Sequence, residues 1–215
     1  MNHYQKLAIV LVRCAGATAT ALGLLGYLKP PGRYEGLDIM PDQIAFAQRA
    51  IQSAYPHFNF TLADIRNGVY NPGGKCDAAA FRFPYRDKTF DVVYAASLYT
   101  HLLPPVVENY FQECQRVLRK GGRCLFSFFV LDFYKGKGTS TCELYEFNHQ
   151  LAGRNDVAVH NPEVPEQVIA YSRSFITRSA SVAGLTMERI LSGIWSLSGP
   201  LQVNEQDLVV LAKDG

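Results

Sequence analysis

Two aspartates, Asp38 and Asp64, lie at the ends of segments with the residue pattern of a β-strand, residues 34–39 and residues 58–62. Ligands of open α/β sheets bind beyond the carboxyl ends of the strands. A carboxylate after the second strand accepts hydrogen bonds from ribose hydroxyls, and one after the third can accept a hydrogen bond from an exocyclic amine such as adenine N6. Ile65 adds an apolar surface for a ring. The pair predicts a nucleotide-like ligand, while each aspartate alone could instead cap a helix or stabilise a turn.

The turn after the first predicted strand reads RCAGATA over residues 13–19. Nucleotide-binding sheets place glycines at this turn so that the backbone can approach the ligand closely. Only Gly16 is present here, and the other small residues keep the loop thin without reaching positive φ angles at little cost. We expect Cys14, Ala15 and Gly16 to contact a ligand through an altered loop. Arg13 supports another interpretation, in which a long cationic side chain blocks the site.

His101 follows the fourth predicted strand, in a loop that we expect to face a substrate. The pKa of an unperturbed imidazole lies near neutral pH, so histidine is a common general base. His101 is therefore the candidate catalytic base. The alternative is a histidine that packs at the start of the following helix.

Strand and helix patterns alternate over the first half of the chain. The apolar run of residues 7–12 is typical of a strand buried on both faces of a parallel sheet. Further strands are predicted at residues 34–39, 58–62 and 90–95, and helices at residues 18–28, 44–51 and 106–119. Gly121 and Gly122 would end the last of these helices. Turn residues predict an irregular connection from Asn67 to Asp87.

The second half begins with the most apolar strand, residues 123–131, which we expect inside the sheet. Residues 132–163 are rich in Gly, Thr, Asn and His without a regular pattern, so we expect an insertion that lacks regular structure. A helix is predicted over residues 165–183. Residues 186–194 and 206–211 follow as two strands without a helix between them, which predicts an antiparallel pair. Together these patterns indicate a doubly wound α/β sheet.

Composition excludes several classes of protein. A chain of 215 residues with 48% hydrophobic content can bury one sizeable core, so we expect a single domain over residues 1–215. A net charge of +2 predicts neither a nucleic-acid partner nor a membrane surface. The five cysteines have no C-x-x-C spacing, which favours a reducing cytoplasm and predicts no metal site. Arg13 interrupts the first apolar run too early for a secretory signal.

Four motifs together resemble class I S-adenosylmethionine-dependent methyltransferases, in particular the small-molecule enzymes of the methyltransferase type 11 group. They are YEGLDI at residues 34–39, AD at 63–64, FRFPY at 81–85 with FDVV at 90–93, and RVLRKGGR at 116–123. The similarity extends over nearly the whole chain from Leu7. It implies a three-layer, Rossmann-like, mostly parallel sheet of seven strands with an antiparallel C-terminal strand.

The same resemblance implies S-adenosylmethionine as cofactor. It places Asp38 at the ribose, Asp64 and Ile65 around the adenine, and the segment after the fourth strand beside the methionine moiety. The sequence departs from the family in lacking the D-x-G-x-G-x-G signature and in having Lys120 where a proline is usual. The residues predicted to contact the cofactor are Cys14, Ala15, Gly16, Asp38, Ile39, Asp64, Ile65, Ala96 and Ser97.

The predicted function is methyl transfer to a small-molecule acceptor, an in-line displacement that needs positioning and, for some acceptors, a base such as His101. We expect Tyr134, Tyr145 and Trp195 to line the acceptor site beside the insertion of residues 132–163. Two other interpretations stay open. One is a degenerate, non-catalytic methyltransferase fold that serves as a binding or scaffold subunit, or an N-terminally truncated fragment. The other is a nicotinamide-dependent dehydrogenase, which shares the role of Asp38 but needs a G-x-G-x-x-G turn that this chain lacks.

Overall fold

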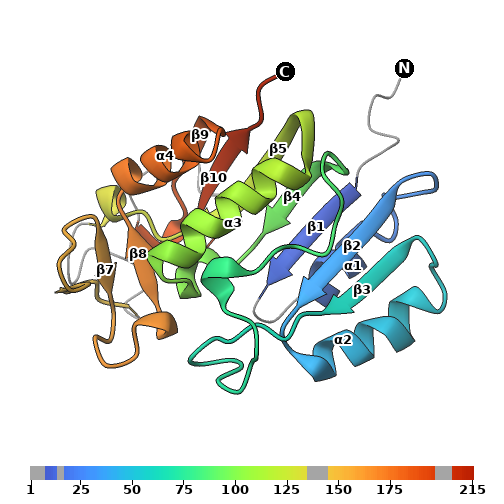
Figure 1. Cartoon of the computed structure of the whole chain (residues 1–215), viewed down its shortest axis with the longest axis horizontal. Helices are drawn as coiled ribbons and strands as arrows, with labels where there is room; N and C mark the ends of the chain where they lie inside the picture. The colour runs from blue at the N-terminus through green and yellow to red at the C-terminus, as the bar shows by residue number, and fades with distance from the viewer. Residues whose placement is uncertain (1–7, 14–16, 135–144, 197–204) are drawn as a thin grey trace.

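A seven-stranded sheet forms the centre of the molecule (Figure 1). The computed structural model describes residues 17–134, 145–196 and 205–215, and the backbone alone of residues 8–13. The strands of this sheet run in the order β3 (Phe58–Leu62), β2 (Arg33–Asp38), β1 (Ala8–Arg13), β4 (Phe90–Ala95), β5 (Leu118–Phe128), β10 (Asp207–Ala212) and β9 (Thr186–Leu191). β10 is antiparallel to both of its neighbours, and the strands from β3 to β5 are parallel. The predicted α/β Rossmann-like fold and the antiparallel closing pair are confirmed.

The order of the strands reverses between β1 and β4. The chain moves outward from β1 to β2 and β3, and then returns to build β4 and β5 on the other side of β1. Connections that leave neighbouring strands in opposite directions open a crevice at the carboxyl ends of those strands. Asp38 lies at this end of the sheet, because it pairs with Arg13 at the end of β1 and with Leu62 at the end of β3.

Helices cover both faces of the sheet (Figure 1). α1 (Ala17–Leu24) and α2 (Pro41–Ala47) lie on one face, and α3 (Pro104–Val117) and α4 (Arg173–Val182) on the other. The alternation of side chains along β2 explains the two layers, because Tyr34 packs in the cluster under α1 and α2 whereas Leu37 packs in the cluster under α3. The Tyr34 hydroxyl also donates a hydrogen bond of 2.7 Å to the carbonyl oxygen of Ala17.

Aromatic packing positions the segment that follows β4. Tyr99 begins a single turn of 3-10 helix, Tyr99–His101, and its ring is buried against β5. Its centroid lies 4.6 Å from that of Phe126 and 4.7 Å from that of Phe128. Aromatic pairs at such distances contribute packing energy beyond the area that they bury. Because the Tyr99 ring is held against β5, the positions of the residues on either side of it are restricted as well.

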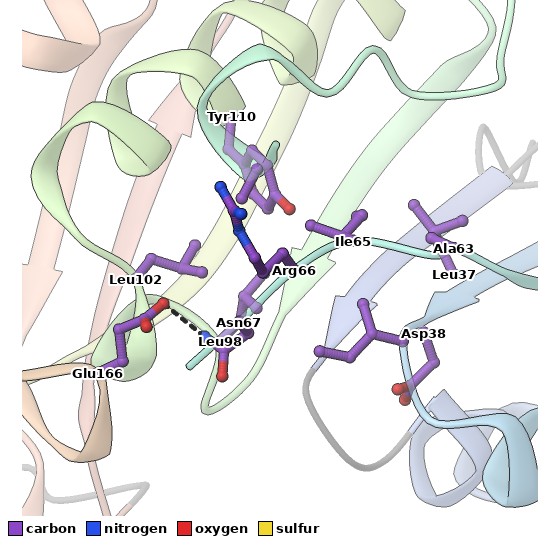
Figure 2. A pocket seen from close by; sticks show the side chains of 12 residues that line it. Leu37, Asp38, Ala63, Ile65, Arg66, Asn67, Leu98, Leu102, Tyr110 and Glu166 are labelled. Carbon is purple, nitrogen blue, oxygen red and sulfur yellow. Dashed lines mark hydrogen bonds between the residues drawn. The ribbon is translucent and has the colours of Figure 1, made fainter. Parts of the chain in front are cut away.

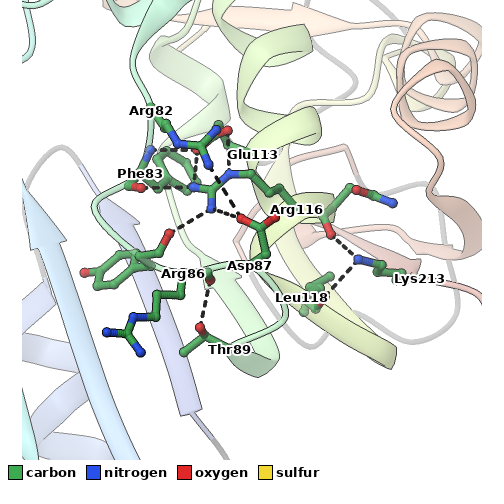
Figure 3. Close-up of polar contacts among 11 residues, drawn as sticks. Arg82, Phe83, Arg86, Asp87, Thr89, Glu113, Arg116, Leu118 and Lys213 are labelled. Atoms are coloured by element: carbon green, nitrogen blue, oxygen red, sulfur yellow. Dashed lines mark hydrogen bonds and ion pairs between the residues drawn. The ribbon is translucent and has the colours of Figure 1, made fainter.

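The connection between β3 and β4 is irregular, as predicted, and contains one turn of 3-10 helix at Ala78–Ala80. Side chains of α3 hold it in place. The Asn109 amide donates hydrogen bonds of 3.1 Å and 3.0 Å to the carbonyl oxygens of Ala78 and Phe81. About two turns further along the helix, Arg116 donates to main-chain and carboxylate oxygens of the same connection (Figure 3). The connection therefore depends on α3 rather than on a helix of its own.

Residues 145–171 contain a second, small sheet that the sequence did not predict. β6 (His149–Gln150), β7 (Val157–Val159) and β8 (Ile169–Tyr171) pair in antiparallel fashion. The expected lack of regular structure over residues 132–163 is thus wrong for its second half, while residues 135–144 lie outside the described residues. The helix predicted over residues 165–183 is also wrong in its first part. It begins at Arg173, because the Ser172 hydroxyl caps it by accepting a hydrogen bond of 3.1 Å from the backbone N–H of Phe175.

The glycine pair after α3 has a different role from the predicted helix cap. α3 ends at Val117 and β5 starts at the next residue, so Gly121 and Gly122 lie within the bounds of β5. Gly121 has a φ of +73°, which favours glycine. The register between β4 and β5 shifts beside this pair, so the glycines introduce an irregularity in the strand instead of ending the helix.

Candidate functional site

A small cavity lies at the carboxyl ends of β2 and β3, beside the segment that follows β4 (Figure 2). Its lining combines apolar walls with a few polar groups, as small-molecule sites do. The lining residues are Leu37, Asp38, Ile39, Ala63, Ile65, Arg66, Asn67, Ala78, Leu98, Leu102, Tyr110 and Glu166.

Asp38 provides a buried carboxylate at one end of the cavity. It is the last residue of β2, and its side chain is directed beyond the strand end (Figure 2). Only 1% of the residue is exposed to solvent. Its Oδ1 accepts a hydrogen bond of 3.0 Å from the backbone N–H of Met40, which fixes the carboxylate at the turn into α2. Asp38 thus both stabilises this turn and faces the cavity.

Apolar side chains from three segments form the walls. Ile39 and Ile65, both predicted as cofactor contacts, line the cavity from the ends of β2 and β3 and are almost fully buried. Leu98 approaches from the segment after β4. A slot with apolar walls and a carboxylate at one end suits a planar ring joined to a sugar, because the ring needs dispersion contacts and the hydroxyls need an acceptor. The donor and acceptor groups present therefore fit an adenosine moiety.

Asp64 is not among the residues that line the cavity. Its side chain is exposed, and its Oδ1 lies 3.5 Å from the Asn71 amide nitrogen, which donates to it. Its main-chain carbonyl accepts hydrogen bonds of 3.1 Å and 2.9 Å from the backbone N–H groups of Lys75 and Cys76. These contacts hold Asp64 as part of a turn on the surface.

Ala96 and Ser97 lie directly after β4, and a small network of hydrogen bonds fixes the conformation of Ser97. Its backbone has a φ of +55°, a left-handed value that is unusual outside glycine. The N–H of Ser97 donates to the Ser127 hydroxyl at 2.6 Å, and the Gln206 amide donates to the Ser97 hydroxyl at 3.0 Å. The Ser127 hydroxyl in turn donates to Gln206 at 2.5 Å, which closes the network. Sequence reasoning did not find Ser127 or Gln206.

His101 is held by main-chain oxygens beside the cavity but does not line it. Its Nδ1 lies 2.8 Å from the carbonyl oxygen of Gln167 and 3.2 Å from that of Glu166, so this nitrogen is the donor. The ring also meets the Tyr70 ring edge-on, with centroids 5.2 Å apart. Burial lowers the pKa of His101 below its ordinary value of 6.5, against the two carbonyl contacts that raise it. The imidazole is therefore neutral at pH 7.

Glu166 forms the other polar end of the cavity, and it was not predicted from the sequence. Its Oε1 accepts a hydrogen bond of 2.8 Å from the Asn67 amide, and its Oε2 accepts one of 2.8 Å from the backbone N–H of Gly68. Asn67 is buried, and its amide also reaches the carbonyl oxygen of His101 at 3.3 Å. Because Glu166 follows Asn67 by 99 positions, only the folded chain brings the two together.

The remaining predicted residues lie elsewhere. Cys14, Ala15 and Gly16 fall outside the described residues, as does the side chain of Arg13. The aromatic residues expected at the acceptor site pack into a cluster with Phe129 and Phe147 and do not line the cavity. The hydrophobic effect explains this placement, because packing together removes apolar ring surface from water. These aromatic residues are Tyr134, Tyr145 and Trp195.

Metal-binding clusters and membrane-spanning helices are both absent from the described part of the chain. No group of three or more His, Cys, Asp and Glu side chains is arranged to hold a metal ion there. Over the same residues, no helix has the length and apolar character needed to span a membrane.

Solved structures with the same fold include several methyltransferases. An S-adenosylmethionine-dependent methyltransferase from Mesorhizobium loti is 14% identical, with a TM-score of 0.61 over 98% of this chain and 93% of that one. A putative methyltransferase in complex with the Trm112 methyltransferase activator of Haloferax volcanii is 12% identical, with a TM-score of 0.61 over 98% of this chain and 84% of that one. A protein from Pyrococcus horikoshii OT3 is 18% identical, with a TM-score of 0.60 over 99% of this chain and 84% of that one. At these identities the likeness shows a shared fold.

Sequence comparison identifies the family. A family model described as a methyltransferase domain matches residues 13–126, which is more than half of the chain. The match begins at Arg13, the last residue of β1, and includes β2, β3, β4 and most of β5, and therefore the strand ends that carry Asp38, Ile39 and Ile65. It confirms the resemblance inferred from the motifs and weighs against a dehydrogenase. The chain belongs to the methyltransferase domain family.

Proposed function

We propose that this protein binds S-adenosylmethionine in the cavity at the ends of β2 and β3 and transfers its methyl group to a small-molecule acceptor. The observation that carries the proposal is the buried carboxylate of Asp38 at one end of a slot with apolar walls. Its position at the end of the second strand is the one from which nucleotide-binding sheets hold a ribose. The family match and the S-adenosylmethionine-dependent methyltransferases among the similar structures support the same ligand.

In this proposal the chain supplies binding and orientation. S-adenosylmethionine supplies a methyl group already activated by a sulfonium, so the transfer needs mainly alignment of the acceptor. Asp38 accepts hydrogen bonds from ribose hydroxyls, while Ile39 and Ile65 exclude water from both sides of the ring. Ala96 and Ser97 border the methionine moiety, with Ser97 held by its network to Ser127 and Gln206. Cys14, Ala15 and Gly16 stay predicted cofactor contacts from the sequence.

His101 is the proposed base for acceptors that must lose a proton. Its Nδ1 donates to main-chain carbonyl oxygens, so Nε2 is the ring nitrogen that carries the lone pair. The lowered pKa keeps this nitrogen unprotonated at pH 7. An oxygen or nitrogen acceptor within reach of Nε2 can therefore transfer its proton to the ring.

Calorimetric titration with S-adenosylhomocysteine tests the cofactor site. Asp38→Asn removes the charge but keeps an oxygen to accept from Met40, so we expect binding to weaken by about 10- to 100-fold, the effect of losing a hydrogen bond to a charged group. Asp42→Asn makes the same change at an exposed position of α2, and it should leave the affinity unchanged. Absence of binding by folded wild-type protein would contradict the proposal.

The class of acceptor is tested separately. We expect label from methyl-labelled S-adenosylmethionine to appear in the small-molecule fraction of a cell extract, rather than in its protein or nucleic-acid fractions. Cofactor binding without transfer to any fraction would favour the non-catalytic interpretation instead.

A further inference from the structure

The end of the cavity opposite Asp38 carries an acceptor that comes from a distant part of the chain. Glu166 lies in a single turn of 3-10 helix, Pro165–Gln167, just before β8. Figure 2 shows its carboxylate beside Asn67, with Leu102 above it and Asp38 on the opposite side of the residues drawn. A ligand that extends from Asp38 along the apolar walls therefore ends near a carboxylate.

The hydrogen bonds of Glu166 leave it able to accept another donor. A carboxylate has about four lone-pair positions. The Asn67 amide and the Gly68 N–H occupy one position on each oxygen, both at 2.8 Å. These two bonds also hold the side chain rigid, so an additional donor meets a preformed acceptor without a further loss of side-chain entropy.

Asn67 itself has no capacity left for a ligand. Its amide nitrogen donates both to Glu166 and to the carbonyl oxygen of His101. Its Oδ1 accepts from the backbone N–H groups of Val69 and Tyr70, at 3.1 Å and 3.0 Å. Asn67 therefore orients Glu166, and the acceptor offered to the cavity is the carboxylate.

Charges around this end favour a neutral or positive donor. Arg66 is the basic residue in the lining, but Figure 2 shows its side chain directed toward Tyr110 and away from Glu166. The groups near Glu166 are otherwise apolar or already bonded to it. An amine that approaches this carboxylate gains a charge-assisted hydrogen bond, whereas an acceptor atom there would meet like partial charge.

We infer that Glu166, rather than Asp64, recognises the exocyclic amine of the adenine ring and so selects an adenine base. This inference rests on the proposed function. The position of Asp64 supports the reassignment, because its carboxylate is exposed, contacts Asn71 and does not line the cavity. Glu166 is the carboxylate that lines the cavity at the end opposite Asp38.

The test compares two ligands, S-adenosylhomocysteine and its analogue in which hydrogen replaces the 6-amino group. For the wild-type protein we expect the adenine compound to bind about 10- to 100-fold more tightly, because the analogue leaves Glu166 without its donor. In Glu166→Gln a neutral acceptor replaces the charged one, so this ratio should fall by about tenfold. Asp64→Asn should leave the ratio unchanged.

A second variant displaces the carboxylate without altering it. A Cβ atom on Gly68 would lie 2.5 Å from Glu166 Oε2, which is the movable end of a side chain. Gly68→Ala should therefore push the carboxylate aside and lower the ratio as Glu166→Gln does. Gly73→Ala is the matched control in the same loop, because a Cβ there meets nothing within 4 Å, and it should keep the wild-type ratio.

Each outcome bears on a different claim. If Glu166→Gln and Gly68→Ala weaken both ligands equally, Glu166 is only a structural tie and the inference is wrong. If the ratio falls in Asp64→Asn instead, Asp64 recognises the base. If the folded wild-type protein binds neither ligand, the proposed function fails and this inference fails with it.

Discussion

Asp207 is the buried carboxyl group whose protonation we expect to affect stability most. The residue is fully buried, and its two oxygens accept hydrogen bonds of 2.7 Å from the backbone N–H groups of Gly193 and Val130. Burial raises its pKa from 3.8 to about 6, although these two bonds act to lower it. Asp207 therefore binds its proton more tightly in the folded state than in the unfolded state. The stability that this proton contributes is complete below the unfolded pKa and is lost as the pH rises through about 6.

Comparison with Asp207→Asn isolates this effect, because the amide is neutral at every pH. The variant loses one backbone hydrogen bond, at a cost of about 1 to 3 kcal/mol that does not change with pH. We expect the free energy of unfolding of the wild type, minus that of the variant, to fall by about 2 kcal/mol from about pH 4.5 to about pH 7.5. Urea denaturation at several pH values measures it. If this difference in the free energy of unfolding instead rises with pH, the two backbone hydrogen bonds lower the pKa of Asp207 more than burial raises it.

Single residues were predictable only where their position along a strand determines their role. Asp38, Ile39 and Ile65 follow strands with clear patterns, and the structure brings all three to one cavity. Glu166 and Gln206 were not predictable, because their partners Asn67 and Ser97 are 99 and 109 positions away. Such pairs form only when whole elements pack together, and a local residue pattern does not indicate how they pack.

At the scale of elements, α3 holds the irregular connection between β3 and β4 chiefly through Arg116. Its guanidinium donates to the carbonyl oxygens of Tyr85 and Phe83 at 2.8 Å and 3.0 Å, and to the carboxylates of Asp87 and Glu113 at 2.8 Å and 2.6 Å (Figure 3). A lysine ammonium cannot reproduce this planar set of donors. We expect Arg116→Lys to lower the free energy of unfolding by about 2 to 3 kcal/mol.

Arg82→Lys is the matched control for this prediction. Arg82 belongs to the same connection and lies 3.6 Å from Asp87, but 69% of its side chain is exposed. Exposed ion pairs contribute little, so we expect a change within about 0.5 kcal/mol. Chemical denaturation measures the free energy of unfolding of both variants. Equal losses in the two would show that Arg116 does not anchor the connection.

Strands of five or more residues were predicted, although β5 spans residues 118–128 and not the predicted 123–131. The structure places β3 and β4 at residues 58–62 and 90–95, the bounds predicted from their apolar patterns. The small sheet was missed because β6, β7 and β8 have two or three residues each, too few to show an alternation. For the same reason, the helix predicted over residues 165–183 wrongly included the residues of β8.

At the scale of the whole molecule, the cavity is lined by parts of the chain that are far apart in the sequence. Most of its lining comes from the ends of β2 and β3, from the segment after β4, and from the turn before β8, and Ala78 and Tyr110 add to it from the β3–β4 connection and from α3. β2, β3 and β4 belong to the main sheet, while Glu166 precedes β8 of the small sheet and accepts hydrogen bonds from Asn67 and Gly68 at one end of the cavity. A ligand in this space therefore stabilises contacts between the two sheets, not only one loop.

Hydrogen exchange with and without S-adenosylhomocysteine tests this coupling. A ligand at about 100 times its dissociation constant stabilises the folded state by about 2.7 kcal/mol, which slows exchange through the affected openings by about 100-fold. We expect slower exchange at residues 38–40, 63–68, 98–102 and 165–168 together, because one ligand bridges all four. Residues 86–89 lie at the opposite end of β4 and provide the internal control, with no change expected. Protection confined to the first three segments would show that the small sheet does not take part in binding.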